Sequence, residues 1–196
     1  MATMVEKLAK VIRVISVAPV LAIIMFTLLF LLRPGFFANG LHYALAIVFI
    51  AALPLLAYPL QPLLPKFSSA GRKGQRELAI IFSLAGYIAG LLFALLFRAP
   101  AGELVVYLTY FISGLLIALS TAVLKFRASG HACGIAGPVT VLAWYISPWF
   151  IAAYLLLPGV HWASRKLKRH TVWELVAGGA ISVGAFFRSL CLVGLF

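Results

Sequence analysis

The chain has 196 residues, of which 64% are hydrophobic and 10% are charged, a balance that excludes an ordinary soluble domain because such domains carry about 25% charged residues. Sixteen lysines and arginines against four glutamates, with no aspartate, give a formal net charge of +12. The cations stand in short clusters between apolar runs, which argues against nucleic acid as a partner and indicates a membrane surface with anionic lipid.

Four segments are predicted to cross a bilayer as helices, which takes about 20 apolar residues each. They cover residues 14–32, 41–64, 78–97 and 104–124. The first follows a few cations, as the apolar part of a signal peptide would, but its apolar run is too long and lacks small residues at a cleavage position. We therefore expect it to be retained as the first membrane span.

Several residues in these segments predict helix packing rather than chemistry. Pro54 is expected to kink the second segment, which neighbouring helices can accommodate. Gly86 and Gly90 lie four residues apart in the third segment, a spacing of small residues that indicates close contact between helices. His42 and His161 are expected to have structural roles.

The segment 132–162 fits either one long helix or a hairpin of two short helices broken at Ser147-Pro148. The distribution of positive charge favours the hairpin. With the N-terminus inside the cell, the chain returns to the cytoplasm after two and four spans, at Lys66, Arg72, Lys73, Arg76, Lys125 and Arg127. A single crossing after residue 132 would export the basic run 165–169, whereas a hairpin keeps that run cytoplasmic.

A final helix over 172–194 would cross the membrane once more and leave the C-terminus outside. The sequence therefore predicts an all-α, polytopic transmembrane helix bundle formed by a single domain over residues 1–196. The bundle has six or seven membrane helices, depending on whether the short helical hairpin at 132–162 counts as one element or two.

A first polar cluster interrupts the apolar chain between the fourth segment and the hairpin. Lys125 and Arg127 supply two cations, and Ser129 supplies a hydroxyl group. Gly130 exposes backbone N–H groups where a helix is expected to begin, and His131 follows it. Cations beside the N–H groups of a helix N-terminus favour the binding of a phosphate group.

A second polar cluster, at residues 164–174, lies on the same side of the membrane if the hairpin forms. It contains Arg165, Arg169 and two lysines, followed by His170 and Glu174. Because Glu174 lies four residues after His170, its carboxylate can accept a hydrogen bond from one ring nitrogen if the segment is helical. Such a bond fixes the tautomer of the imidazole and leaves the other nitrogen free to act as a nucleophile.

Together, the Ser129-Gly130-His131 tripeptide, the basic run and the spacing of His170 and Glu174 resemble the type 2 phosphatidic acid phosphatase superfamily. The residues from 125 to 179 look most like the short multi-span members found in archaea and some bacteria. The resemblance implies His170 as the nucleophile, Glu174 as its orienting carboxylate and His131 as the general acid. It implies neither a metal nor a cofactor, and it implies as phosphate-binding residues Lys125, Arg127, Ser129, Gly130, Arg165 and Arg169.

Three positions depart from the pattern of this superfamily. The Arg33-Pro34 pair lacks the lysine that precedes such a pair in the family, so a cation at 125–127 would take its place. The arginine that precedes the nucleophile in the family falls on Ser164 here, so a cation at 165–169 would replace it. Glu174 stands where aspartate is common.

The sequence therefore leads to the hypothesis of a multi-pass lipid phosphate phosphatase in a prokaryotic cell membrane, with its site on the cytoplasmic side. Hydrolysis would pass through a phosphohistidine, and phosphatidate and polyprenyl phosphates fit these residues equally well. No pattern indicates an oligomeric state. Two alternatives stay open, namely a catalytically inactive relative that binds or moves anionic lipid, which Ser164 motivates, and a purely structural membrane subunit.

Overall fold

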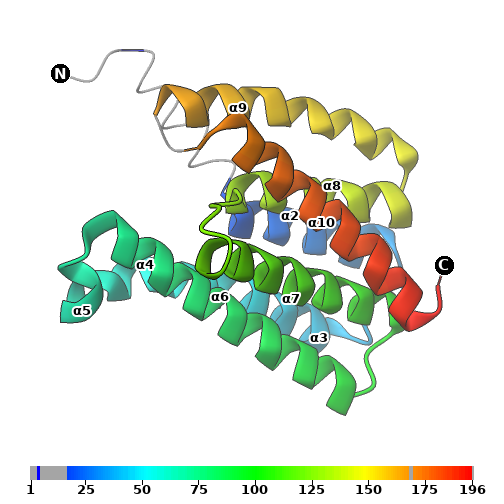
Figure 1. Cartoon of the computed structure of the whole chain (residues 1–196). Coiled ribbons are helices and arrows are strands. Elements are labelled where there is room, and N and C mark those ends of the chain that lie inside the picture. Colours follow the sequence, from blue (N-terminus) through cyan, green and yellow to red (C-terminus); the bar gives the residue numbers. More distant parts are fainter. Residues whose placement is uncertain (1–3, 5–16, 168–169, 196) are drawn as a thin grey trace.

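The protein is described by a computed structural model that covers residues 4, 17–167 and 170–195 (Figure 1). Within these residues the regular structure is helical throughout and contains no strand. The predicted all-α class is confirmed for this part of the chain.

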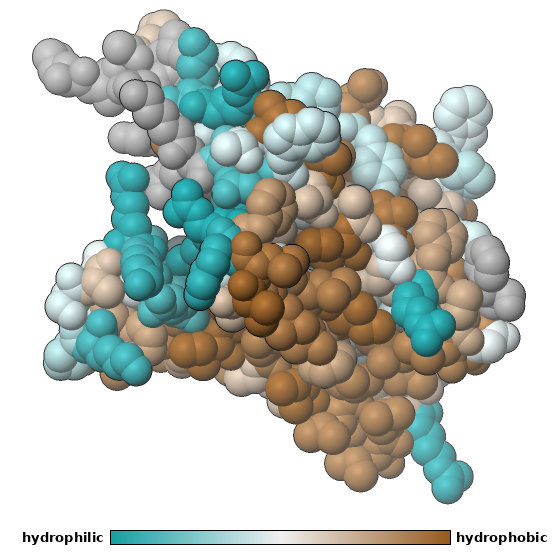
Figure 2. Space-filling model, viewed as in Figure 1, coloured by the Kyte–Doolittle hydropathy of each residue, from teal (hydrophilic) through white to brown (hydrophobic). Residues whose placement is uncertain are grey.

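Among the described residues, four helical segments are long and apolar enough to cross a membrane: Gly40–Leu63, α6 (Gly71–Leu96), α7 (Ala101–Ala122) and α10 (Val172–Val193). The mean hydropathy of their most apolar windows lies between 1.7 and 2.4. Only 28% or 33% of each window is buried inside the protein, so most of this apolar surface faces outwards. Figure 2 shows the broad hydrophobic surface that results, which suits lipid rather than water.

The predicted first span is described only in part. Helix α2 covers Ala18–Leu32, and residues 14–16 lie outside the described part of the chain. Pro19 occupies the first turn of α2, where the N–H groups have no partner in the helix and a missing one is tolerated. The helix packs against the π-helical turn η1 (Val48–Ala52) and against α8 (Gly130–Tyr145).

The segment Gly40–Leu63 is continuous but changes its helical form along its length. It consists of α3 (Gly40–Ile47), the π turn η1, α4 (Leu53–Leu60) and the 3₁₀ turn η2 (Gln61–Leu63). Pro54 has no N–H to donate to the carbonyl of Ile50, and its ring crowds that carbonyl. The wider π turn directly before Pro54 accommodates the lost bond, so the helix continues.

Gly86 and Gly90 on α6 bring neighbouring helices into close contact, as their spacing predicts. A methyl group on Gly86 would overlap the backbone carbonyl of Phe49 in η1. One on Gly90 would overlap the ring of Tyr107 in α7. The prediction that these glycines serve helix packing is confirmed.

The chain turns back after α8, as the charge pattern predicts. Ser147 has an extended backbone, with φ −161° and ψ 135°, which is the conformation preferred before a proline. The second arm differs from the expected single helix, because it starts as the 3₁₀ helix η3 (Pro148–Leu155) and continues as α9 (Leu156–Lys166).

The two arms of this hairpin lie side by side. The hydroxyl oxygens of Thr140 and Tyr154 are 2.6 Å apart. Val160 packs in one buried cluster with Ile135 and Val139. Because the residues of these contacts are placed nearly symmetrically about Ser147-Pro148, α9 carries the chain back towards the end of the bundle where α8 begins (Figure 1).

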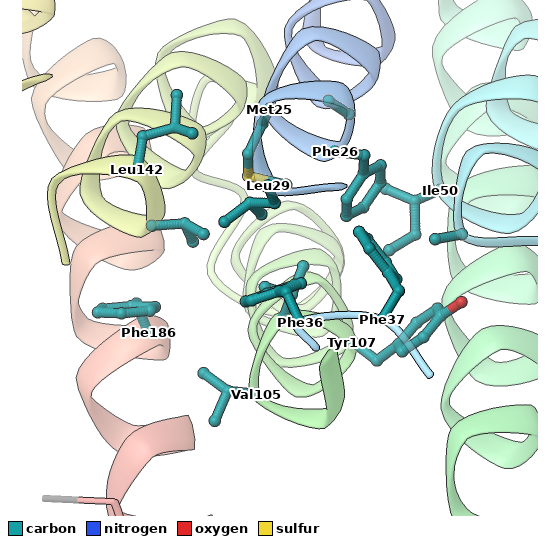
Figure 3. Close-up of a cluster of buried hydrophobic side chains, with 14 of the residues drawn as sticks. Met25, Phe26, Leu29, Phe36, Phe37, Ile50, Val105, Tyr107, Leu142 and Phe186 are labelled. Carbon is teal, nitrogen blue, oxygen red and sulfur yellow. The ribbon is translucent and has the colours of Figure 1, made fainter. Parts of the chain in front are cut away.

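The hydrophobic core gathers side chains from α2, η1, α7, α8, α10 and the loop between α2 and α3 (Figure 3). Its largest members include Met25, Phe26, Leu29, Phe36, Phe37, Ile50, Tyr107, Leu142 and Phe186. The rings of Phe36 and Phe37 lie 5.1 Å apart, so the loop is anchored in the core by two aromatic side chains. This core joins the hairpin and α10 to the rest of the bundle.

A buried polar pair links α3 to α7 at the end of the bundle where these helices begin. Nδ1 of His42 lies 3.0 Å from both carboxylate oxygens of Glu103, and the two residues are 6% and 1% exposed. Glu103 stands in the first turn of α7, where the helix N-terminus favours a negative charge. The structural role expected for His42 is therefore supported by a partner that the sequence did not reveal.

Removal of one partner of this pair is expected to destabilise the protein strongly. His42→Ala would leave the buried Glu103 carboxylate without its partner, and the loss of one member of a buried pair costs about 3–5 kcal/mol. The midpoint of thermal unfolding of the purified protein in detergent measures the effect. Lys73→Ala is the control because it removes an exposed pair with Glu77, at 3.9 Å, that contributes little. Equal midpoints for the two variants would contradict this expectation.

Candidate functional site

The loop between α7 and α8 lies against the start of α10. The backbone N–H of Ser129 donates to the carbonyl oxygen of Glu174 at 2.8 Å. Ala128 and Ser129 are fully buried at this junction. The two polar clusters therefore meet at one end of the bundle, on the left of Figure 1.

Helix α10 begins with a capping box that also holds His170. The side chain of Thr171 accepts from the N–H of Glu174 at 3.2 Å, and Glu174 Oε2 accepts from the N–H of Thr171 at 2.9 Å. The same carboxylate oxygen lies 3.1 Å from Nδ1 of His170. The predicted contact between His170 and Glu174 is present and engages Nδ1. His170 is not helical, however, because it precedes the N-cap Thr171, so the contact forms at the capping box and not between two turns of a helix.

Two arginines from different elements lie at the end of the bundle that contains Glu174. Nε of Arg127, in the loop before α8, lies 3.7 Å from Oε1 of Glu174. Arg76, in the second turn of α6, is partly buried and donates from Nη2 to Thr121 Oγ1 at 3.0 Å. Its guanidinium also interacts electrostatically with Arg127 and Glu174. Two guanidinium groups and one carboxylate at this end of the bundle give a net positive charge, which favours an anion.

The first turn of α8 contains the other predicted histidine. Ser129 is the N-cap of this helix, because its Oγ accepts from the N–H of Ala132 at 3.3 Å. Gly130 and His131 follow as the first helical residues, and His131 is partly exposed. The N–H groups of a first turn have no partner within the helix and carry the positive end of its dipole. The predicted helix start is therefore present beside the start of α10.

The three remaining predicted phosphate-binding residues are Lys125, Arg165 and Arg169. Lys125 is exposed and has a positive φ of 54°, and its Nζ donates to the carbonyl oxygen of Ala122 at 2.9 Å, so it caps the end of α7. Arg165 is exposed in the last turn of α9, while Ser164 beside it is fully buried. Arg169 lies outside the described residues.

Cations from several elements gather at this end of the bundle, where Figure 2 shows hydrophilic side chains on the left. They come from α5 (Pro65–Ser68), α6, the loop before α8 and α9: Lys66, Arg72, Lys73, Arg76, Lys125, Arg127, Arg165 and Lys166. Glu77 and Glu174 are the carboxylates among the described residues at this end. In the same part of the chain, no three His, Cys, Asp or Glu side chains gather as they would to hold a metal ion. The site is therefore suited to a negatively charged group.

Arg76 is not among the predicted site residues, because orientation of the chain alone explains the cations at 72–76, although contact with a lipid headgroup also fits them. Its contact with Thr121 joins residues 45 positions apart, so no local pattern identifies it. Arg76 lies one turn after Arg72 at the start of an apolar helix, and this position is the sequence signal that could have identified it as a site residue. Comparison of the chain with family models, with curated proteins and with solved structures gave no match.

Arg127 and Arg76 are expected to bind a phosphate-like anion. Each of Arg127→Gln and Arg76→Gln should weaken the binding of inorganic vanadate by about 10-fold or more, because a hydrogen bond to a charged group contributes about 1.5–3 kcal/mol. Isothermal titration calorimetry on the purified protein measures the affinity. Arg72→Gln removes the same charge from an exposed position on α6 and serves as the control. Equal weakening in all three variants would mean that the general positive charge, and not this site, attracts the anion.

Proposed function

We propose that the chain is a membrane lipid phosphatase, a phosphoric ester hydrolase that cleaves a phosphomonoester or diphosphate from a lipid of the phosphatidate or polyprenyl phosphate type. The observation that carries the proposal is the meeting of the His170–Glu174 pair with Arg127 and with the first turn of α8, which contains His131. The same features, with the sequence motifs, support membership of the type 2 phosphatidic acid phosphatase superfamily.

His170 is the proposed nucleophile. Because Glu174 engages Nδ1, the carboxylate favours the tautomer with hydrogen on Nδ1 and leaves a lone pair on Nε2. Attack by Nε2 forms a P–N bond to the phosphoryl group while the P–O bond to the lipid alcohol breaks. Once bound through Nε2, the imidazole carries a positive charge that the Glu174 carboxylate stabilises.

His131 is the proposed general acid. A proton from its ring passes to the leaving oxygen, so a phosphomonoester releases its lipid as a neutral alcohol and a diphosphate releases it as the lipid monophosphate. Water then attacks the phosphohistidine, the P–N bond breaks, and the proton of the water returns to His131 as phosphate is released. His131 is thereby ready for the next cycle.

Charge stabilisation is assigned to the two guanidinium groups and to the N-terminus of α8. Phosphoryl transfer places negative charge on the equatorial oxygens, so fixed donors near those oxygens are its main requirement. Arg127 lies at the Glu174 carboxylate that holds His170. Arg76 interacts electrostatically with Arg127 and Glu174. The N–H groups of Gly130 and His131 supply further donors at a helix start.

The proposed membrane arrangement has six or seven helices, made of the four long segments, α2 and the hairpin of α8, η3 and α9. The cations of the site end support a cytoplasmic location for that end, since the opposite end carries fewer, among them Arg33 and Arg98. The outward apolar surface of the bundle lets a lipid keep its chains in hydrocarbon while its headgroup reaches the cations. The proposed substrate is therefore a lipid phosphate of the cytoplasmic leaflet of a prokaryotic cell membrane.

Phosphate release from purified protein is the experiment that tests the proposed reaction. Phosphatidate, phosphatidylglycerophosphate and a polyprenyl diphosphate are offered in mixed micelles. His170→Ala and His131→Ala should each lower the rate by at least about 100-fold, because each removes a group that transfers the phosphoryl group or a proton. His161→Ala removes a histidine on α9 outside the proposed mechanism and should leave the rate within a few-fold of the wild type.

Full activity in His170→Ala or in His131→Ala would remove the assigned mechanism. Brief incubation with a ³²P-labelled substrate followed by acid-free denaturation should trap an acid-labile label on the wild type and none on His170→Ala. Retained lipid binding with no phosphate release from any substrate would favour the alternative of an inactive relative that binds or moves anionic lipid.

A further inference from the structure

Gly178 allows the backbone of the loop before α8 to lie directly on α10. A methyl group on this glycine would overlap the carbonyl oxygen of Ser129 and would lie 3.0 Å from both the carbonyl carbon and the nitrogen of the same residue. All three atoms belong to the backbone, so no side-chain rotation can relieve the overlap. Any larger residue at position 178 must therefore move the loop or the helix.

The contact at Gly178 and the hydrogen bond to Glu174 hold the backbone of the same residue, Ser129. Ser129 donates its N–H to the carbonyl of Glu174 at 2.8 Å, and Gly178 lies one helical turn further along α10. The Ser129 backbone is thus seated between two successive turns of one helix face. Ser129 is fully buried at this contact.

Both proposed reacting histidines depend for their position on the contact of the Ser129 backbone with α10. Ser129 caps α8, so its position fixes where the helix starts and where His131, two residues later, is carried. Glu174 holds His170 through its carboxylate and belongs to the turn of α10 on which Ser129 rests. The separation of the two imidazoles therefore depends on how closely the loop approaches α10.

We propose that Gly178 is a positioning residue, which sets the distance between the general acid His131 and the nucleophile His170 by letting the loop of Ser129 rest on α10. This inference rests on the proposed function. Replacement by alanine shifts the loop by about an ångström, and a misplacement of this size in a reacting group can cost about 100-fold in rate.

Two other glycines of α10 provide matched controls. A methyl group on Gly179 would lie 3.8 Å from the Cβ of Ala136, an ordinary contact, and one on Gly184 would have nothing within 4 Å. Alanine is a better helix former than glycine, so all three substitutions favour the helix itself equally. A defect confined to Gly178→Ala therefore reports on the contact with Ser129.

The test compares two phosphate esters that differ in their need for an acid. A lipid alcohol leaves poorly unless it is protonated, whereas p-nitrophenolate leaves readily without a proton. In Gly178→Ala, kcat/KM for the lipid phosphate should fall about 100-fold and that for p-nitrophenyl phosphate less than about 10-fold, as in His131→Ala. Gly179→Ala and Gly184→Ala should match the wild type with both substrates.

Only folded protein hydrolyses either ester, so misfolding of Gly178→Ala lowers both rates by the same factor. The ratio of the rates for the lipid phosphate and p-nitrophenyl phosphate is therefore unaffected by a lower yield. Equal losses with both substrates, or activity equal to that of Gly179→Ala, would overturn the positioning role. If the wild type releases phosphate from neither ester, the proposed function fails, and the positioning role that rests on it is overturned with it. An active wild type together with Gly178→Ala equal to Gly179→Ala would overturn the positioning role alone.

Discussion

The hydrogen bond from the Ser129 backbone to the Glu174 carbonyl is the interaction on which the candidate site depends. It joins the loop that carries Arg127 to the helix start that carries the His170–Glu174 pair. Because both groups are backbone atoms, the join is independent of side-chain rotamers. Four candidate elements are thereby brought to one end of the bundle: the His170 imidazole beside Glu174, a guanidinium group, a helix N-terminus and the His131 imidazole that follows it.

The hydrogen bond between Ser129 and Glu174 requires that the chain, after α8, return to the end of the bundle where α8 begins before α10 starts. The turn at Ser147-Pro148 provides the return, and the contact between Thr140 and Tyr154 holds its two arms together. Small residues let α8 and α10 approach closely, since a methyl group on Gly137 would lie 2.5 Å from Ser182 Oγ. In an apolar environment, where burial of apolar side chains gives little driving force between helices, such close backbone packing is what holds helices together.

The features that were predictable from the sequence are those with a local pattern. Apolar length located the spans, the i to i+4 spacing located the His170–Glu174 contact, and the position of the basic run indicated the hairpin. Features that depend on tertiary contact were not predictable. The His42–Glu103 pair joins residues 61 positions apart, and Arg76 reaches the site only because α6 begins where α7 ends. Ser129 and Lys125 also hold helix ends, which residue type alone did not indicate.

One phosphate group is proposed to bind between His170 and the cations at the start of α8 and α10. A structure of the purified protein with bound vanadate, determined by electron cryomicroscopy or crystallography, tests it most directly. We expect vanadium bonded to Nε2 of His170, with its oxygens facing Arg127 and Arg76 and the ring of His131 beside the apical oxygen. Vanadate bound elsewhere, or imidazoles of His170 and His131 too far apart to contact one vanadate, would contradict it.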